Sequence, residues 1–132
     1  MGLSDVEVIR DQYAAVNERD WGRAMSHYAE DVVLVVHDGL SPGTYEGADS
    51  LGRWYGDWFA TFDRDSHFDI TRLEACEDGS ILLVADYQGS GRGSGAKIEG
   101  NVVWLYRLSG GKIVRVEGGT SLDVLEVLGL AE

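Results

Sequence analysis

The fold of this chain is decided by residues 97–117, which read KIEGNVVWLYRLSGGKIVRVE. Apolar side chains recur at alternate positions in both halves, and Gly110-Gly111 separates the halves. This pattern predicts two antiparallel strands, residues 97–108 and 112–117, joined by a tight turn. Residues 68–76 and 80–88 show the same alternation around a turn at Asp78-Gly79. Together these segments predict an antiparallel meander.

The first half of the chain carries helical periodicities instead. Ser4 and Glu7 form a capping box, which predicts a helix over residues 5–18. Asp20 is a suitable N-cap for a short second helix, whose apolar positions are Trp21, Ala24, Met25 and Tyr28. A third helix is predicted by apolar side chains at helical spacing: Leu51, Trp54, Tyr55, Trp58 and Phe62.

Helices followed by a run of strands favour an α+β fold. Residues 32–37 are β-branched and apolar and predict a first strand, and a loop around Pro42 follows it. We expect a cone-shaped α+β roll, in which about three N-terminal helices pack on a strongly bent antiparallel β-sheet. Such an arrangement leaves a cavity between the two layers, where function is expected to sit.

Composition limits the classes of function. The length of 132 residues predicts one domain, residues 1–132. A formal net charge of −12 disfavours nucleic acid and anionic membrane surfaces as partners. Cys76 is the only cysteine, and the first residues carry acids rather than an apolar signal segment, so we expect a cytoplasmic protein. The longest apolar runs are far below the roughly 20 residues that span a bilayer.

Three further segments, outside the predicted strands, are rich in small residues or in leucine. One edge of the third helix carries Gly52, Gly56 and Ala60, which suggests that another element approaches it closely. Residues 89–95 are glycine-rich but lack the context of a phosphate-binding loop, so a flexible hairpin is expected there. Residues 122–128 are rich in leucine and predict a short C-terminal helix or tail that docks on the domain.

Several segments resemble the SnoaL-like branch of the nuclear-transport-factor-2-like superfamily, which includes polyketide cyclases and ketosteroid isomerases. They are residues 17–20, Tyr28-Ala29-Glu30-Asp31-Val32, Tyr45-Glu46-Gly47, the glycine-rich hairpin, and Gly111-Lys112-Ile113-Val114. The resemblance implies the cone-shaped fold, a small hydrophobic ligand, no cofactor, and a homodimer formed through the outer face of the sheet. It does not imply one reaction, because the superfamily includes enzymes and binding modules alike.

The residues that carry the family's reactions are mostly missing. The positions of the isomerase residues fall near Gln12, Val36 and Trp104, and those of the epoxide hydrolases near Ala85, Tyr87 and Gly118. The cyclase branch is expected to use an acid or base on the last strand, where Glu117 is the nearest candidate.

Alternation along the strands predicts which side chains face the cavity. The family placement puts these residues on the cavity face: Val32, Leu34, Val36, Leu83, Ala85, Tyr87, Val102, Trp104, Val114 and Val116. The opposite face receives His37, Asp86, Arg115 and Glu117 among apolar residues, which suits cross-strand ion pairs or a dimer interface. A β-bulge would bring an acid into the cavity instead.

Two functional hypotheses follow. In the first, a small and mostly apolar ligand lies between the third helix and the sheet, in a pocket formed by Val36, Trp54, Tyr55, Trp58, Tyr87, Trp104 and Val116. Any catalysis would be cofactor-free proton transfer, an isomerisation or a cyclisation, by Tyr13, His37, Asp38 or Glu117. In the second, large side chains fill the cavity and the chain is a non-catalytic binding or assembly module acting as a homodimer. The spacing of the histidines and Cys76 predicts no metal site.

Overall fold

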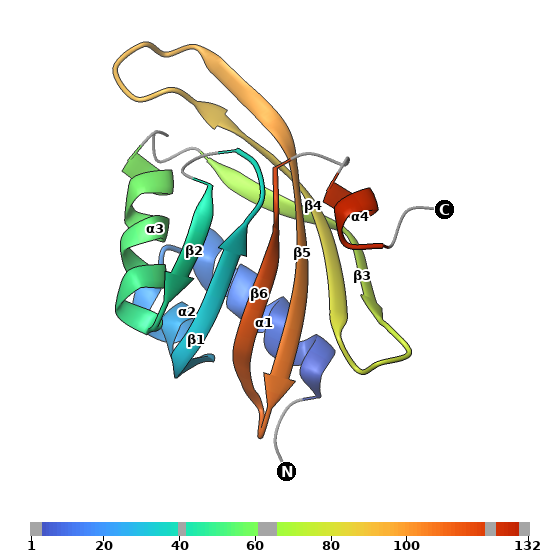
Figure 1. The fold of residues 1–132 in the computed structure, drawn as a ribbon. Helices are drawn as coiled ribbons and strands as arrows, with labels where there is room; N and C mark the ends of the chain where they lie inside the picture. The colour runs from blue at the N-terminus through green and yellow to red at the C-terminus, as the bar shows by residue number, and fades with distance from the viewer. Residues whose placement is uncertain (1–3, 40–41, 61–65, 121–123, 130–132) are drawn as a thin grey trace.

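The computed structural model describes residues 4–39, 42–60, 66–120 and 124–129. Within these residues the helices are α1 (Asp5–Asn17), α2 (Trp21–Met25), α3 (Ala48–Ala60) and α4 (Val124–Val127). The strands are β1 (Tyr28–Val36), β2 (Gly43–Glu46), β3 (His67–Ala75), β4 (Ile81–Ser90), β5 (Lys97–Ser109) and β6 (Lys112–Gly119). Figure 1 shows α1 crossing one face of the sheet and α4 lying on the other. The predicted cone-shaped α+β fold is confirmed.

The described strands form one sheet in the order β2-β1-β6-β5-β4-β3. Its neighbouring strands are antiparallel except β1 and β6, which are parallel, so the expectation of an antiparallel sheet is wrong at this pair. The reason is connectivity. No hairpin joins β1 to β6, because the chain leaves β1 through β2 and α3 and returns along the meander β3–β6. Only a hairpin forces neighbouring strands to run in opposite directions.

The first two helices begin where their capping residues predict. The Ser4 hydroxyl accepts a hydrogen bond from the Glu7 backbone N–H at 3.3 Å, and the Glu7 carboxylate reaches back to Ser4. The Asp20 carboxylate accepts the backbone N–H of Arg23 at 3.2 Å. Tyr28, however, is the first residue of β1 and not part of α2, so β1 starts earlier than residue 32.

Strand β2 is absent from the sequence-based prediction. Its residues Tyr45 and Glu46 pair with Leu34 and Val33 of β1. A strand of four residues is too short to show an alternating pattern, so tertiary pairing decides its structure. Helix α3 then ends at Ala60 in the described part of the chain, and Phe62 lies outside the described residues.

The predicted alternation of strand faces is confirmed, with one correction. Most of the residues expected on the inner face are buried in the main core, and Tyr87 packs partly buried against it. Val114 is the exception. A register shift in the β5–β6 pairing sets Arg107 opposite Arg115 but Leu108 opposite Ile113. Ile113 is therefore the core residue at this point, and the half-buried Val114 belongs to neither hydrophobic cluster.

The outer face of the sheet carries a second, small hydrophobic cluster. Leu82, Val84 and Val103 are buried there beneath Leu125 of α4 and Leu128 just beyond it. The predicted docking of the C-terminal segment is thus confirmed for Leu125 and Leu128, and residues 122–123 lie outside the described part. None of the described helices combines the length and apolar character needed to cross a membrane.

Candidate functional site

The space between helices and sheet, where the ligand was expected, is filled by side chains. Among the described residues, a cavity in this space has a volume of about 10 Å³. It is lined by Tyr13, Val16, Trp54, Tyr55, Trp58, Phe68, Val102 and Trp104. The Trp54 ring packs against the rings of Trp58 and Trp104, at centroid distances of 5.8 and 5.7 Å. A cavity of this volume has room for about one water molecule at most, so as it stands it does not hold an organic ligand.

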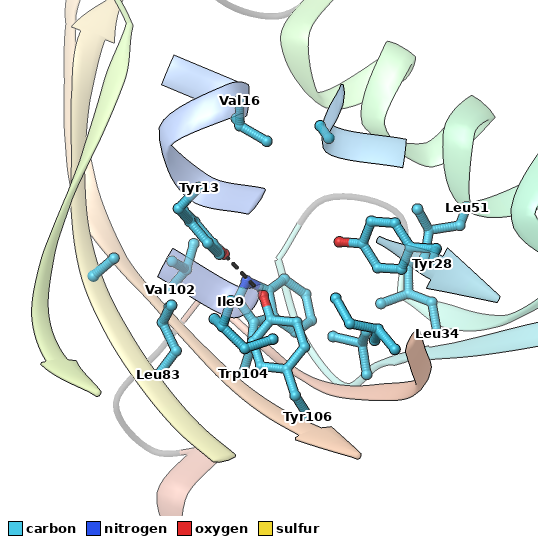
Figure 2. Close-up of a cluster of buried hydrophobic side chains, with 14 of the residues drawn as sticks. Ile9, Tyr13, Val16, Tyr28, Leu34, Leu51, Leu83, Val102, Trp104 and Tyr106 are labelled. Carbon is cyan, nitrogen blue, oxygen red and sulfur yellow. Dashed lines mark hydrogen bonds between the residues drawn. The ribbon is translucent and has the colours of Figure 1, made fainter. Parts of the chain in front are cut away.

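Buried hydroxyl groups lie beside this cavity. The Tyr106 hydroxyl donates to that of Tyr13 at 3.3 Å, as Figure 2 shows. The hydroxyls of Tyr28 and Tyr55 are 2.9 Å apart, and the Gln12 amide donates to Tyr55 at 3.4 Å. Burial raises the pKa of all these tyrosines above its usual value. The phenols therefore stay neutral near pH 7 and act as hydrogen-bonding groups rather than as bases.

The predicted pocket residues are only partly brought together. Trp54, Tyr55, Trp58 and Trp104 line the small interior cavity. Val36 and Val116 are buried in the core without lining it. Tyr87 contacts the Trp58 ring at a centroid distance of 5.2 Å but also lines a separate hollow with Asp86 and Asn101. The aromatic residues predicted for the pocket therefore lie in the core or pack against it. This is what the second hypothesis expects, in which large side chains fill the cavity.

A larger groove lies on the other side of α3. Its volume is about 490 Å³, and its lining residues are Trp21, Met25, Gly52, Tyr55, Gly56, Phe59, Ala60 and Arg92. Trp21 and Met25 are one helical turn apart on α2, so they present one wall. The glycines and Ala60 of α3 form the floor. Arg92 comes from the β4–β5 hairpin, which extends toward the same end of the molecule as the end of α3 (Figure 1).

Neighbouring side chains hold the aromatic wall of the groove in place. The Trp21 ring meets the Phe59 ring edge-on at 4.9 Å, and Tyr55 stacks on Phe59 at 6.4 Å. The Arg19 guanidinium lies 4.9 Å from the centre of the Phe59 ring. Arg19 is itself anchored, because it donates to the Ser66 carbonyl and, at 2.7 Å, to the Ser66 hydroxyl. The wall is therefore pre-formed, as ligand sites usually are.

The small-residue edge of α3 has a different role from the one predicted. A close approach of another element was expected along Gly52, Gly56 and Ala60. In the described part of the chain, a Cβ atom at Gly56 would have no heavy atom within 4 Å, and one at Gly52 would meet only Met25 Cε, at 3.8 Å. The edge faces the groove instead. Trp21, one of the predicted apolar positions of the second helix, is 39 % exposed at this groove.

The candidate acid–base residues lie in two separate places. Tyr13 is buried in the interior. His37 and Glu117 lie on the outer side of the β1–β6 pair, with His37 Nε2 at 2.7 Å from Glu117 Oε2. The Asp38 carboxylate accepts the backbone N–H of Thr120 at 2.7 Å, which anchors the loop after β1. The structure joins His37 to Glu117 but brings neither to Tyr13.

Of the residues that line the groove, only Tyr55 was predicted as a site residue from the sequence. The available sequence signal for a groove was the glycine edge of α3, which lies beside the aromatic residues Tyr55 and Phe59. The described residues contain no group of three or more His, Cys, Asp or Glu side chains placed to hold a metal ion.

Helices packed as a cone on a bent mixed sheet place the chain in the class of proteins with the nuclear-transport-factor-2-like fold. The model of the SnoaL-like domain matches residues 9–116. The chain belongs to the SnoaL-like family. A comparison with curated proteins finds no match.

Solved structures with the same fold are numerous. A nuclear-transport-factor-2-like protein from Burkholderia thailandensis is 26% identical, with 99% of each chain covered and a TM-score of 0.77. A protein of ketosteroid isomerase-like fold from Catenulispora acidiphila, solved in complex with trimethylamine, is 23% identical over 95% of this chain and 94% of that one, with a TM-score of 0.73. TerC, co-crystallised with polyporic acid, is 17% identical over 94% and 96%, with a TM-score of 0.75.

Proposed function

We propose that this SnoaL-like protein binds a small, mostly apolar molecule in the groove between α2 and α3. The observation that carries the proposal is the contrast between the two cavities. The groove has a volume of about 490 Å³ and the interior only about 10 Å³. Ligand sites of drug-sized molecules measure roughly 300–1,000 Å³, so of these two spaces only the groove has the capacity.

The chemistry of the lining supports an apolar ligand with a flat ring. Trp21, Tyr55 and Phe59 offer aromatic faces and edges, and Met25 adds an adaptable thioether. The glycine floor lets a ring lie close to the α3 backbone. Arg92 supplies a charged group at one end, suited to an acceptor on the ligand. Two of the neighbours named above, one solved in complex with trimethylamine and one co-crystallised with polyporic acid, support a role in binding a small organic molecule.

Binding without turnover accounts best for the arrangement. Of the candidate catalytic residues, none lines the groove. A catalytic role for Tyr13, His37, Asp38 or Glu117 in proton transfer stays a prediction, for which turnover of a bound ligand would be the evidence.

The test uses naphthol as a probe and follows its binding by the change in tryptophan fluorescence and in thermal stability. Ligand at 100 times its dissociation constant stabilises a protein by about 2.7 kcal/mol. Gly56→Leu fills the groove from its floor, where a Cβ atom would have no described heavy atom within 4 Å. We expect this variant to fold and to lose naphthol binding.

The matched control is Arg53→Leu, which adds the same side chain to an exposed position of α3 outside the groove. It should bind naphthol like the parent protein. Equal affinities of Gly56→Leu and Arg53→Leu for naphthol would refute the groove as the site.

A second candidate function is assembly as a homodimer through the outer sheet face. Val33 and Val35 are only half buried on that face of β1 and lie outside the cluster that α4 covers. Beside them on β6, Glu117 pairs with His37 and, at 3.5 Å, with Arg115. A mixed apolar and polar surface of this kind is typical of subunit interfaces. The two candidates are compatible, because groove and outer face lie on different sides of the molecule.

A further inference from the structure

The groove beside α3 has a charge balance opposite to that of the whole chain. The chain carries 23 Asp and Glu residues against 11 Lys and Arg, which gives a formal net charge of −12. Among the described residues that line the groove, Arg92 is the only charged one, and none is an acid. One cation at the end of a mostly apolar hollow favours an apolar ligand that carries one negative charge.

A second arginine adds to the positive charge beside the groove. The guanidinium of Arg19 lies 4.9 Å from the centre of the Phe59 ring and donates to the carbonyl and the hydroxyl of Ser66. Ser66 is a neutral partner, so this contact leaves the positive charge of Arg19 in place. Asp57 follows Gly56 along α3 but does not line the groove. A cationic ligand would therefore be repelled here, and a neutral ligand would gain little from the arginines.

The turn between β4 and β5 sets the position of Arg92. Gly91, just before it, is buried, and its backbone N–H donates to the Ala96 oxygen at 2.7 Å. The Gly95 N–H donates to the Gly91 oxygen at 3.0 Å, which closes the turn. A Cβ atom at Gly91 would lie 2.7 Å from the Ser94 hydroxyl oxygen, so the backbone is closely packed here. Arg92 therefore reaches the groove from a closed turn rather than from an open loop.

We infer that the ligand of the groove is an aromatic carboxylate, and that Arg92 selects it by binding the carboxylate through two parallel N–H donors. This inference rests on the proposed function, which places a ligand in the groove. The aromatic ring lies against Trp21, Tyr55 and Phe59, and the carboxylate lies at the hairpin end. A guanidinium carries five N–H donors in a planar fork, so Arg92 can bind a carboxylate alongside partners from the protein. Such charge-assisted pairs are about twice as strong as neutral hydrogen bonds.

The experiment compares naphthoate with naphthamide, which have nearly the same shape and differ in charge. Calorimetric titration at neutral pH should show that the parent protein binds naphthoate about tenfold more tightly, the effect of one charge-assisted pair. This preference should shrink as salt is added, because Arg92 is exposed and salt screens exposed charges. Arg92→Gln removes the charge and keeps a polar side chain. It should bring the affinity for naphthoate down to that for naphthamide.

The matched control is Arg53→Gln, which removes the same charge from an exposed position of α3 outside the groove. It should keep the preference for naphthoate, whereas Gly56→Leu should lose both probes because it fills the groove. Equal binding of both probes by the parent protein, or a preference that survives Arg92→Gln, would overturn this inference and leave the groove as a binding site. Failure of both probes to bind the parent protein would overturn the proposed function together with it.

Discussion

Asp11 is the residue that ties the N-terminal segments together. From α1 it pairs with Arg23 of α2, and its Oδ2 lies 2.7 Å from His27 Nε2, just before β1. The hydrogen bond from Arg23, reinforced by that from His27, lowers the pKa of the Asp11 carboxyl from 3.8 to about 2. A carboxyl that is more acidic in the folded state than in the unfolded chain stabilises the fold as long as it is ionised.

This linkage predicts how stability changes with pH. The contribution of Asp11 is complete above pH 3.8 and declines as the pH falls toward 2, because the unfolded chain then binds a proton that the folded chain does not. Asp11→Asn should remove the part of the acid-induced loss of stability that comes from protonation of Asp11. The measurement is the urea midpoint at intervals between pH 5 and pH 2, with the exposed Asp49→Asn as the control. A decline in Asp11→Asn as steep as in the parent protein would contradict the assignment.

Arg19 shows a second effect at the scale of a single residue. It is the only described residue other than glycine with a positive φ, 62°. That backbone conformation is uncommon for a side chain of this size. It turns the chain between α1 and α2 and directs the guanidinium toward Ser66 and under Phe59. The free-energy cost of this backbone conformation at Arg19 thus helps to position the Phe59 ring in the aromatic wall of the groove.

At the scale of elements, α3 is a helix with two different faces. Leu51, Trp54 and Trp58 are buried in the core, whereas Gly52, Gly56 and Ala60 face the groove. The periodicity of the large side chains made the helix predictable. The outward glycine edge was read as a contact surface, because a sequence pattern does not show whether a second element reaches it.

Two glycines should respond in opposite ways to the same substitution. Gly56→Ala places a methyl group in open space within a helix and should stabilise the protein by about 0.5–1 kcal/mol. Gly118→Ala places its methyl group 1.8 Å from the backbone oxygen of Val103, in the β5–β6 pair opposite Trp104. Overpacking of this kind costs about 3 kcal/mol or more.

Urea unfolding of the two alanine variants beside the parent protein measures both effects. The slope of the transition should be unchanged in Gly56→Ala, since only stability changes. A Gly118→Ala protein as stable as the parent would show that the close approach of β5 and β6 is not rigid.

At the scale of the whole molecule, the two sheet faces have different coverings. The inner face is covered by the described helices α1 and α3, and the outer face only in part, by α4 over β4 and β5. The rest of the outer face, on β1 and β6, contains the His37–Glu117 pair. Strand alternation, combined with the family placement of the cavity face, predicted this position for both residues.

If this face is a dimer interface, Glu117→Ala should shift the protein toward monomers, because it leaves His37 and Arg115 without their shared partner. Sedimentation velocity over a range of concentrations measures the effect. Glu99→Ala, on the exposed β4–β5 hairpin, is the control and should leave the association unchanged. A parent protein that is monomeric throughout, or a Glu117→Ala dimer as stable as the parent, would exclude this role.

Local physical chemistry accounts for what could be predicted from the residues alone. The capping groups Ser4 and Asp20 and the side-chain periods of helix and strand set the elements and the buried face of each strand. These signals depend on neighbours within a few positions of the chain. Strand alternation, with the cavity face assigned by the family resemblance, also predicted that His37 and Glu117 would share the outer face.

The parallel pairing of β1 with β6, the bulge at Val114 and the position of the cavity depend on contacts between segments distant in the chain. Whether Trp54, Trp58 and Trp104 leave a space for a ligand is a question of volumes that meet across three elements. The periodicity of side chains along the sequence does not show whether these volumes together fill the interior. The tertiary structure alone filled the interior and opened the groove beside α3, because packing joins side chains that the sequence keeps apart.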